Sequence, residues 1–396
     1  MPAGQGSLGH DAGMNEPPSR FDRVRGLREM LTATGAGIYL ATHQAGPVPA
    51  ETLTAVHESD EMELRVGRAG ADRAEDIEQR EREARAVASA AITASPERVA
   101  LTHGAAEAAR LVALEVLVPG SGKRVLLVRG LDRVVAAAVR DVADVAGAAV
   151  EVVDSPPEEV ADDFALVVVA HVDADGRVAD VRALAAAAKP TGARLAVDVG
   201  RSAGAMPLDV TALGADFVFG DTHRWLLGPD ALAFLWITPE LDPEVPEWLR
   251  QASAPFGRGQ LLALARSVGW LLMYVELPWA LDRTVGLADQ LYEDLGAIEG
   301  VELLAGQAHG AVAAFRIAGW DAESVADELG RSIFAIVEAD AEVDVVRASV
   351  GAWNRESELT RFAERVAELA AHTPETLPRR PSPTVISGPL ESEEDT

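Results

Sequence analysis

The stretch DVGRSAGAMPLDVTALGADFVFGDTHRWLLGPDALAFLWITPEL, residues 198–241, decides the fold. It contains two short apolar runs, Asp216–Phe219 and Ala231–Ile237, and it begins where a third run, Arg194–Asp198, ends. Continuous apolar runs of this length are typical of strands inside a sheet that helices cover on both faces. Polar residues follow the runs directly, and we expect them to lie together at one edge of that sheet.

Further runs of the same kind precede this stretch, and Ala-rich helical patterns separate them. They are Val99–Thr102, Arg124–Val128, Ala149–Val153 and Ala165–Ala170. Strands that alternate with helices form parallel sheets between two layers of helices. The sequence therefore predicts an α/β fold whose large domain, residues 50–255, holds a mostly parallel seven-stranded sheet.

The pattern changes after this domain. Two helical segments, 259–276 and 279–297, come first. The next expected elements are the strands Ala311–Ile317 and Asp344–Ala348 and the helices Ala322–Leu329 and Ser357–Ala371. We therefore expect linking helices and a small α+β C-terminal domain over 256–373, joined by a helix over Phe21–Thr34.

The two ends of the chain have a different composition. Residues 1–20 are rich in Gly, Pro and polar residues, and residues 374–396 are Pro-rich and then acidic. Such segments do not bury enough apolar surface to fold, so both are predicted to be disordered tails. Residues 21–49 would form an N-terminal arm that leads into the large domain.

The composition excludes several classes of function. Among 396 residues, 63 are acidic and 35 basic, and the net charge of −28 repels nucleic acid. Cysteine is absent, which excludes disulfides, thiolate metal sites and a cysteine nucleophile on this chain. No apolar run reaches the roughly 20 residues of a membrane span. The N-terminus has no signal-peptide core, so we expect a cytoplasmic protein without a membrane or nucleic-acid partner.

The strand ends are where ligands bind in an open parallel sheet. The residues that follow the runs here are His103-Gly104-Ala105-Ala106, Arg129–Arg133, His171, Asp198 with Arg201, and Asp221-Thr222-His223-Arg224. The small residues Gly104 and Ala105 open a helix over Ala105–Leu117, so their backbone N–H groups can bind an anion. These segments are expected to converge on one crevice.

Together these segments resemble the class V aminotransferase fold, a branch of the fold type I pyridoxal-phosphate enzymes that includes cysteine desulfurases, isopenicillin N epimerase-like proteins and sulfoxide lyases. Residues 198–241 are similar to that family's stretch from the pyridine-binding Asp to the lysine loop. Further similar segments are YLATHQAGPVP (39–49), ALTHGAAEAARL (100–111), VVVAHVDADGRV (167–178) and VRASVGAWNRESEL (346–359). The resemblance extends from Tyr39 to Ala371.

The resemblance implies a role for each residue at the strand ends. Asp198 would pair with the pyridine nitrogen, Gly104 and Ala105 would bind the phosphate through their N–H groups, and His223 would lie beside that phosphate. Arg347 would bind a carboxylate of the substrate as a bidentate fork. Simpler interpretations exist for three of them: Asp198 as a turn cap, His223 as a core histidine, and Arg347 as the partner of a surface acid.

The same resemblance breaks at the positions that carry the chemistry. Arg224 stands where the family has its Schiff-base lysine, and a guanidinium is neither nucleophilic nor able to form that bond. Asp221 replaces a Ser beside the phosphate, Arg201 replaces a Gln near the ring, and Ala106 replaces a Thr. The loop Arg129–Arg133 lacks the histidine that normally stacks on the ring.

Two further features concern the same site. The dimer partner's loop, which normally supplies a Thr to the phosphate, reads Gly257-Arg258-Gly259-Gln260. The only lysines, Lys123 and Lys189, both precede strands, so they are expected on the face opposite the crevice.

Three functional hypotheses remain open. In the first, the chain has lost Schiff-base chemistry and serves as a binding or partner protein. Arg201, Arg224 and a neighbouring subunit's Arg258 then form an anion pocket, or the arginines pair with Asp198 and Asp221 and fill the cavity.

In the second hypothesis the chain is an aminotransferase-like or lyase-like enzyme acting on a small amino acid. It would hold pyridoxal phosphate without a covalent bond, and His223, His103 or His171 would move protons. His171 would then also contact the substrate. In the third, His103, His171 and His223, with Asp198 and Asp221 nearby, bind a metal ion.

The expected partners are a small carboxylate-bearing molecule and a second copy of the chain. Fold type I enzymes resemble one another in forming homodimers, and the apolar helix over Leu261–Tyr274 is a candidate dimer surface. The alternative is that this helix packs within its own chain.

Overall fold

A computed structural model describes residues 20–118, 124–241 and 255–378 of the chain. All seven predicted runs are strands of one sheet. They are β2 (Val99–Thr102), β3 (Arg124–Val128), β4 (Val150–Val153), β5 (Phe164–Ala170), β6 (Arg194–Asp198), β7 (Phe217–Asp221) and β8 (Ala233–Ile237). The two predicted tails lie almost wholly outside the described residues, as does Lys123.

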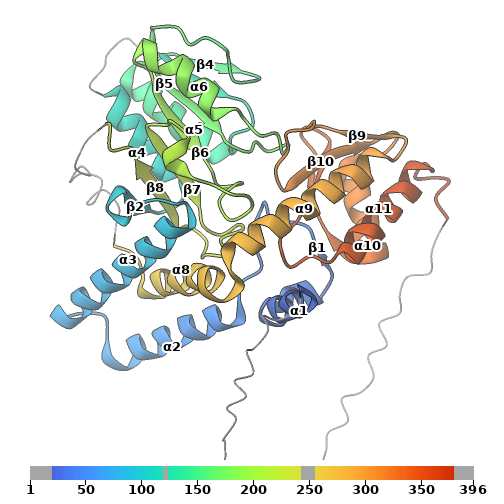
Figure 1. Cartoon of the computed structure of the whole chain (residues 1–396), viewed down its shortest axis with the longest axis horizontal. Coiled ribbons are helices and arrows are strands. Elements are labelled where there is room, and N and C mark those ends of the chain that lie inside the picture. The colour runs from blue at the N-terminus through green and yellow to red at the C-terminus, as the bar shows by residue number, and fades with distance from the viewer. Residues whose placement is uncertain (1–19, 119–123, 242–254, 379–396) are drawn as a thin grey trace, which may run out of the picture.

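The sheet has the order β2-β8-β7-β6-β5-β3-β4 (Figure 1). Neighbours from β7 to β4 are parallel, whereas β8 runs antiparallel to both β7 and β2. The prediction of an α/β fold with a mostly parallel seven-stranded sheet is therefore confirmed. One boundary differs in a way that matters: β7 continues to Asp221, so this carboxylate belongs to the end of the strand.

Two layers of helices cover the sheet. Apolar residues of α4 (Ala105–Leu117) and α5 (Arg133–Ala146) pack on one face. Those of α3 (Ala71–Ala91), α6 (Val181–Ala188) and α8 (Arg258–Trp270) pack on the other. Burial on both faces explains why the strands are almost continuously apolar.

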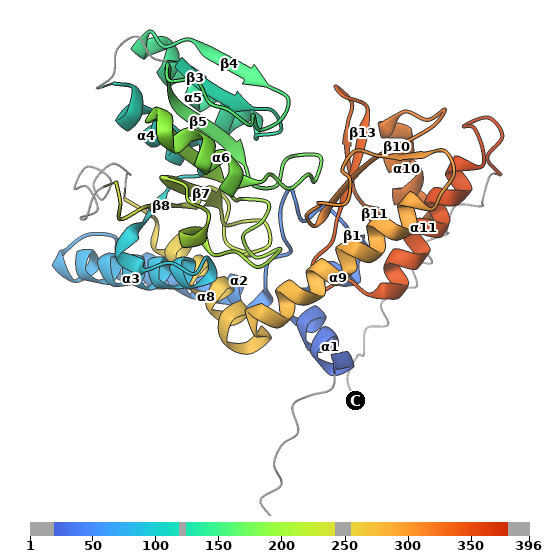
Figure 2. The ribbon, with the colours of Figure 1, turned by 45° about the horizontal axis from the view of Figure 1, so that its top comes forward.

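A second unit follows in the sequence and stands beside the large sheet (Figure 2). Its antiparallel sheet has the order β12-β13-β10-β9. Its strands are β9 (Val301–Leu303), β10 (Val312–Ile317), β12 (Glu338–Asp340) and β13 (Val345–Ser349), and its helices are α10 (Ala322–Ile333) and α11 (Glu356–Ala370). A parallel pair, β1 (Ile38–Tyr39) and β11 (Ala335–Ile336), connects the N-terminal arm to this unit.

The remaining long helices lie in the N-terminal arm, directly after that arm, and between the two units. α1 (Arg20–Met30) packs through Leu27 on the core of the C-terminal unit, and Leu31, just after it, joins that core. α9 (Leu277–Gly296) crosses from the large unit to the small one (Figure 2). α2 (Ala50–Val66) was not predicted, because its surface is largely polar and it buries only Thr52 and Ser59.

The segment predicted as one helix over 259–276 is interrupted. α8 passes into a π-helix, η5 (Leu271–Val275), and Glu276 then adopts a left-handed conformation with φ 64° before α9 begins. The two helical stretches are bent by 86°. Among the described residues no single helix has the length and apolar character to cross a membrane; the bent pair meets that criterion only when its two halves are taken together.

Short 3-10 helices fill the connections. They are η1 (Thr32–Gly35), η2 (Pro96–Arg98), η3 (Lys189–Thr191) and η4 (Val210–Ala212).

The two units meet at the loop that follows β7. Trp225 is buried there, and its indole N–H donates to the carbonyl oxygen of Val350 in the C-terminal unit at 2.7 Å. The backbone N–H of Gly46 in the N-terminal arm donates to the carbonyl oxygen of His223 at 2.7 Å. A Cβ on Gly46 would lie 2.1 Å from the carbonyl oxygen of Arg224, so only glycine permits this approach. The loop that carries His223 and Arg224 is thus held from both sides.

Candidate functional site

A carboxylate between two arginines occupies the carboxyl ends of the central strands. Asp132 follows β3 and precedes α5, Arg201 follows β6, and Arg224 follows β7. The Nη2 of Arg224 lies 2.5 Å from Oδ2 of Asp132, and the Nη2 of Arg201 bonds to Oδ1 of the same carboxylate. Both arginines are buried. The strand ends therefore converge as the sequence predicts, and they converge on a charge cluster.

The electrostatics of this cluster keep Asp132 ionised. Burial alone would raise its pKa, but the charges and hydrogen bonds of Arg201 and Arg224 hold that pKa well below its usual range. The nearby carboxylates likewise raise the pKa of Arg224 against the effect of burial. Two buried cations thus depend on one bridging anion, an arrangement in which removal of the anion is costly.

Asp198, at the end of β6, lies beside this cluster and is almost fully buried. Its Oδ1 accepts a hydrogen bond from the N–H of Gly200 at 2.8 Å, and its Oδ2 has no partner among the described residues. Burial, reinforced by the charge of Asp132, raises the pKa of Asp198 to about 6, although Arg224 and Arg201 oppose the shift. A Cβ on Gly200 would lie 2.6 Å from Nη1 of Arg224, so this glycine leaves the space that the guanidinium fills.

The N-terminus of α4 holds a carboxylate of the same chain. Gly104 caps the helix with φ 90°, and the N–H of Ala105 donates to Oδ1 of Asp221 at 2.9 Å. The other oxygen of Asp221 lies 4.0 Å from Nη2 of Arg224. The turn that the sequence predicts as an anion site therefore has an anion beside it already, supplied by the end of β7.

The histidines lie in three different environments. The Nδ1 of His223 is buried without a partner in the described part of the chain. The Nδ1 of His171 is 3.0 Å from the hydroxyl of Ser202, and burial lowers the pKa of this imidazole. His103 packs its ring against Phe256 at 4.4 Å between centroids.

His171 lines a cavity of about 700 Å³ instead of the arginine cluster. The cavity lies between the start of α6, the loop 206–213 and the start of α9, and Asp198, Arg201 and Arg224 are not among its lining residues. A metal site receives no support, because the described residues contain no group of three or more histidines and carboxylates able to hold one ion.

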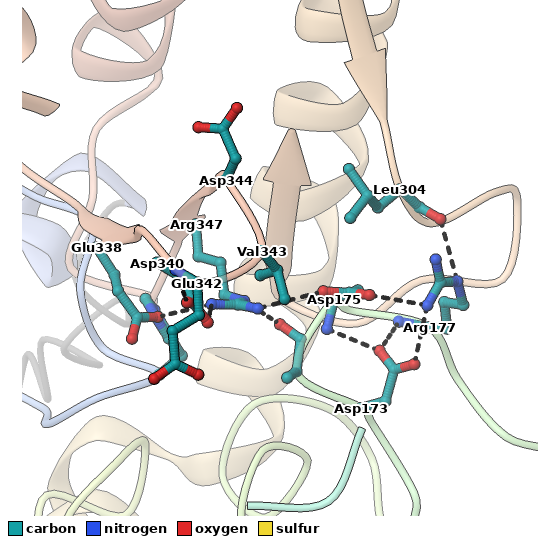
Figure 3. A network of polar contacts seen from close by, with 12 residues as sticks. Asp173, Asp175, Arg177, Leu304, Glu338, Asp340, Glu342, Val343, Asp344 and Arg347 are labelled. Carbon is teal, nitrogen blue, oxygen red and sulfur yellow. Dashed lines mark hydrogen bonds and ion pairs between the residues drawn. The ribbon is translucent and has the colours of Figure 1, made fainter. Parts of the chain in front are cut away.

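Arg347, on β13, is surrounded by acids of its own chain (Figure 3). Its Nη1 lies 2.9 Å from Asp340 and 3.6 Å from Glu338, and its Nη2 lies 3.4 Å from Asp175. Its Nε donates to the carbonyl oxygen of Ala174 at 2.8 Å. Each nitrogen of the predicted carboxylate fork therefore faces an oxygen of the protein.

Hydrogen bonds link Ser349, His43 and Glu338 near Arg347, and the sequence does not predict this group. His43 Nδ1 lies 2.8 Å from the hydroxyl of Ser349, and its Nε2 lies 2.6 Å from Oε2 of Glu338. Burial lowers the pKa of His43. Burial would raise the pKa of Glu338, but the hydrogen bond from His43 and the charge of Arg347 lower it to about 2. His43 falls within the similar segment 39–49, which was the one available signal.

The remaining arginines of the predicted site pair elsewhere. Arg258 bonds through Nε to Asp76 of α3 in the same chain at 2.6 Å. Arg129 pairs with Asp154 on the surface, and Arg133 pairs with Glu342 of the C-terminal unit. Within one chain the crevice therefore contains Arg201 and Arg224. Arg258, at the start of α8, contacts α3 instead.

Comparison with known proteins gives a consistent family. The aminotransferase class V profile matches residues 38–254. Kynureninase from Pseudomonas fluorescens is 37% identical over 123 residues, which cover 30% of this chain and 29% of that enzyme. A probable cysteine desulfurase from Methanothermobacter thermautotrophicus is 29% identical over 243 residues, covering 57% and 59%. The chain thus matches less than two thirds of the length of either relative.

Solved structures share the fold at lower identity. The cystine C-S lyase C-DES, in complex with cysteine persulfide, superposes with a TM-score of 0.77 at 17% identity, covering 85% of this chain and 99% of that one. A cysteine desulfurase from Thermococcus onnurineus NA1 has a TM-score of 0.75 at 20% identity, covering 88% and 98%. A variant of C-DES carries glycine linked covalently to its pyridoxal phosphate.

The residues present here do not fit pyridoxal phosphate. Asp198 is suitable, because it has a buried, unpartnered oxygen that the N–H of the pyridine ring would satisfy. Asp221 is not suitable, because its carboxylate faces the helix N-terminus where the phosphate would bind. Arg224 is not suitable either, because its guanidinium fills the space beside Asp198 and Gly200. A second anion at this helix would meet the carboxylate of Asp221 in a poorly solvated site, where like charges repel strongly.

Replacing the bridging carboxylate should destabilise the fold. Asp132→Asn leaves two buried guanidinium groups without their shared anion, and we expect a loss of about 3–5 kcal/mol in the free energy of unfolding. Denaturant titration followed by circular dichroism measures it. The matched control is Asp154→Asn, which breaks an exposed arginine pair and should cost less than about 1 kcal/mol. If the two substitutions lower the free energy of unfolding equally, the buried cluster contributes no more to stability than an exposed ion pair does.

Asp198 should make stability fall as the pH rises. Its pKa is about 6 in the folded protein against 3.8 ordinarily, so the folded state holds the proton to higher pH than the unfolded state does. The resulting stabilisation is complete below pH 3.8 and is lost as the pH rises through about 6. Asn at position 198 does not titrate. As the pH rises from 3.8 to about 6, the free energy of unfolding of Asp198→Asn should therefore increase by roughly 2–3 kcal/mol relative to that of the unmodified protein. Unfolding measured at a series of pH values, taken as a difference between the two proteins, tests this; a flat difference contradicts it.

Proposed function

Since this chain belongs to the aminotransferase class V family, we propose that it is a member without Schiff-base chemistry that serves as a binding or partner protein. The observation that carries the proposal is the environment of Arg224. This side chain is 7% exposed, bonds to Asp132 and lies near Asp198 and Asp221. A guanidinium in such surroundings stays protonated and offers no lone pair for attack on a carbonyl carbon.

Lys189 is not positioned to take over. Lys189 lies in η3, ahead of β6, and its ammonium group pairs with Glu240 on the surface. Asp198 lies at the opposite end of the same strand. A strand of five residues spans roughly 13 Å or more. Lys123 also precedes its strand, although it lies outside the described residues.

An alternative function is supported by two atoms. The Oδ2 of Asp198 and the Nδ1 of His223 are buried without partners among the described residues. In this alternative the chain is an enzyme of the aminotransferase or lyase type that holds pyridoxal phosphate without a covalent bond. His223 would hold or move a proton at Nδ1, and Asp221 would have to leave the N-terminus of α4.

A small carboxylate-bearing molecule remains the ligand we propose. Arg347 would be its partner, but that guanidinium already faces Asp175, Glu338 and Asp340. Such a ligand has to displace at least one of these acids. Weak binding is therefore the expectation at this position.

A second copy of the chain is the proposed macromolecular partner. The inner face of α8 packs within the chain through Leu261, Leu264 and Val268, so it is unavailable for a dimer. What supports a dimer is the end of this segment, where Met273 and Tyr274 are largely exposed beside a cavity of about 700 Å³ that also reaches α2.

A charge placed on this surface should dissociate the dimer. The double substitution Met273→Glu and Tyr274→Glu puts two carboxylates on the proposed contact, where desolvation would cost several kcal/mol. Sedimentation velocity should then show a monomer, whereas the unmodified protein and a Val145→Glu control, which is exposed on α5, sediment as dimers. A monomer in the unmodified protein would exclude the proposal directly.

Pyridoxal phosphate should fail to form a bound, reducible adduct. We expect no visible absorbance after incubation and gel filtration, and no mass added by borohydride, because Arg224 and Asp221 occupy the site. Retained absorbance that is insensitive to borohydride would support the non-covalent alternative instead.

Arg224→Lys is the companion variant. It restores an amine but leaves Asp221 beside the helix, so we expect it to gain no adduct either. An adduct in this variant would mean that the single arginine accounts for the loss.

A further inference from the structure

The carboxylate of Asp221 lies at the start of α4. Helix N-termini attract anions because the helix dipole and unpaired N–H groups point outward there. α4 has 13 residues, and Gly104, with φ 90°, presents no Cβ to this turn. The atom nearest to where such a Cβ would lie is Oδ1 of Asp221, at 3.7 Å.

The bond between Asp221 and this helix joins two segments that are far apart in the sequence. The N–H groups of Glu107 and Ala108 are turned inward to the carbonyl oxygen of Gly104. The N–H of Ala105 is turned instead toward β7, where Asp221 accepts it at 2.9 Å. The side chain of Asp221 is 13% exposed, so the bond is largely shielded from water.

The side chain of Arg224 faces the same carboxylate. Its guanidinium is buried, and its Nη2 faces Oδ2 of Asp221 at 4.0 Å. Its Nε and Nη1 have no partner among the described residues. Without Asp221, the turn would therefore combine an outward N–H, a helix dipole and the buried guanidinium of Arg224, whose Nη2 also bonds to Asp132.

We propose that Asp221 is an internal anion that occupies a latent phosphate site, formed by the N-terminus of α4 and Arg224. The carboxylate satisfies this site in the unmodified protein and excludes phosphate and phosphate monoesters from it. A small neutral residue at position 221 opens the site to them. This inference concerns the chain's own carboxylate and does not depend on whether pyridoxal phosphate binds.

The test compares Asp221→Ser with the unmodified protein by thermal unfolding in inorganic phosphate and in sodium chloride of equal ionic strength. We expect the unmodified protein to melt at the same temperature in both salts. The variant should melt a few degrees lower in chloride and regain at least half of that loss in phosphate, with a saturating dose dependence. Calorimetric titration with inorganic phosphate should give a Kd below roughly 10 mM for the variant, as expected for a charge-assisted site, and no heat for the unmodified protein.

Matched variants separate this site from general salt effects. Asp180→Ser removes another helix cap, the carboxylate that accepts from the N–H of Ala183 at 3.0 Å, and should gain no response to phosphate. Asp221→Asn keeps an acceptor in place and should bind phosphate at least tenfold more weakly than Asp221→Ser. Adding Arg224→Gln to Asp221→Ser should abolish the response.

Two results would overturn the inference. One is a folded Asp221→Ser variant that responds to phosphate no more than Asp180→Ser does. The other is phosphate binding by the unmodified protein at this turn. If Asp221→Ser does not fold in chloride, recovery on refolding in phosphate supports the inference, and equal failure in both salts overturns it. No pyridoxal compound is used, so failure here is distinct from failure of the proposed function.

Discussion

The carboxylate of Asp132 is the group on which the rest of the crevice depends. It bonds to Arg201 and Arg224, which come from the loops after two other strands, and both arginines are buried. Taking a guanidinium out of water costs several kcal/mol, which only an ionised partner with good geometry offsets. The three loops after β3, β6 and β7 are therefore coupled, because movement of any one of them would break an ion pair and leave a buried charge without its partner.

The same principle orders the other charges. Asp221 accepts a hydrogen bond at the N-terminus of α4, and the cost of burying the charge of Asp198 raises the pKa of that carboxyl to about 6. In the C-terminal unit Arg347 faces three acids. The carboxylates of Asp132, Asp198 and Asp221 thus lie against the guanidinium groups of Arg201 and Arg224, although Nε and Nη1 of Arg224 have no partner among the described residues. A site that binds an anionic cofactor needs the opposite condition, an excess of positive charge over negative.

The sequence predicts where these residues lie better than it predicts what they contact. Apolar runs that end in polar residues place Asp198, Asp221 and Arg224 at one sheet edge, since parallel strands end together. It does not predict that Asp132 pairs with both arginines, because that depends on side-chain torsions and on the missing Cβ of Gly200. The sequence allows an acid partner for Arg347 but does not identify Asp175, Glu338 or Asp340. β12 (Glu338–Asp340) is short and acidic, and nothing in its composition indicates a strand.

Internal anions change what a ligand of this crevice must achieve. A carboxylate tethered beside its cation competes at an effective concentration of about millimolar or higher, whereas a free ligand competes at its own concentration. A singly charged small molecule therefore gains little by exchanging places with Asp221 at the α4 turn or with Asp175 at Arg347. A ligand has to bring more charge, or a partner has to bring additional contact area, to displace them. The largely exposed side chains of Met273 and Tyr274, beside a cavity that reaches α2, offer such contact area.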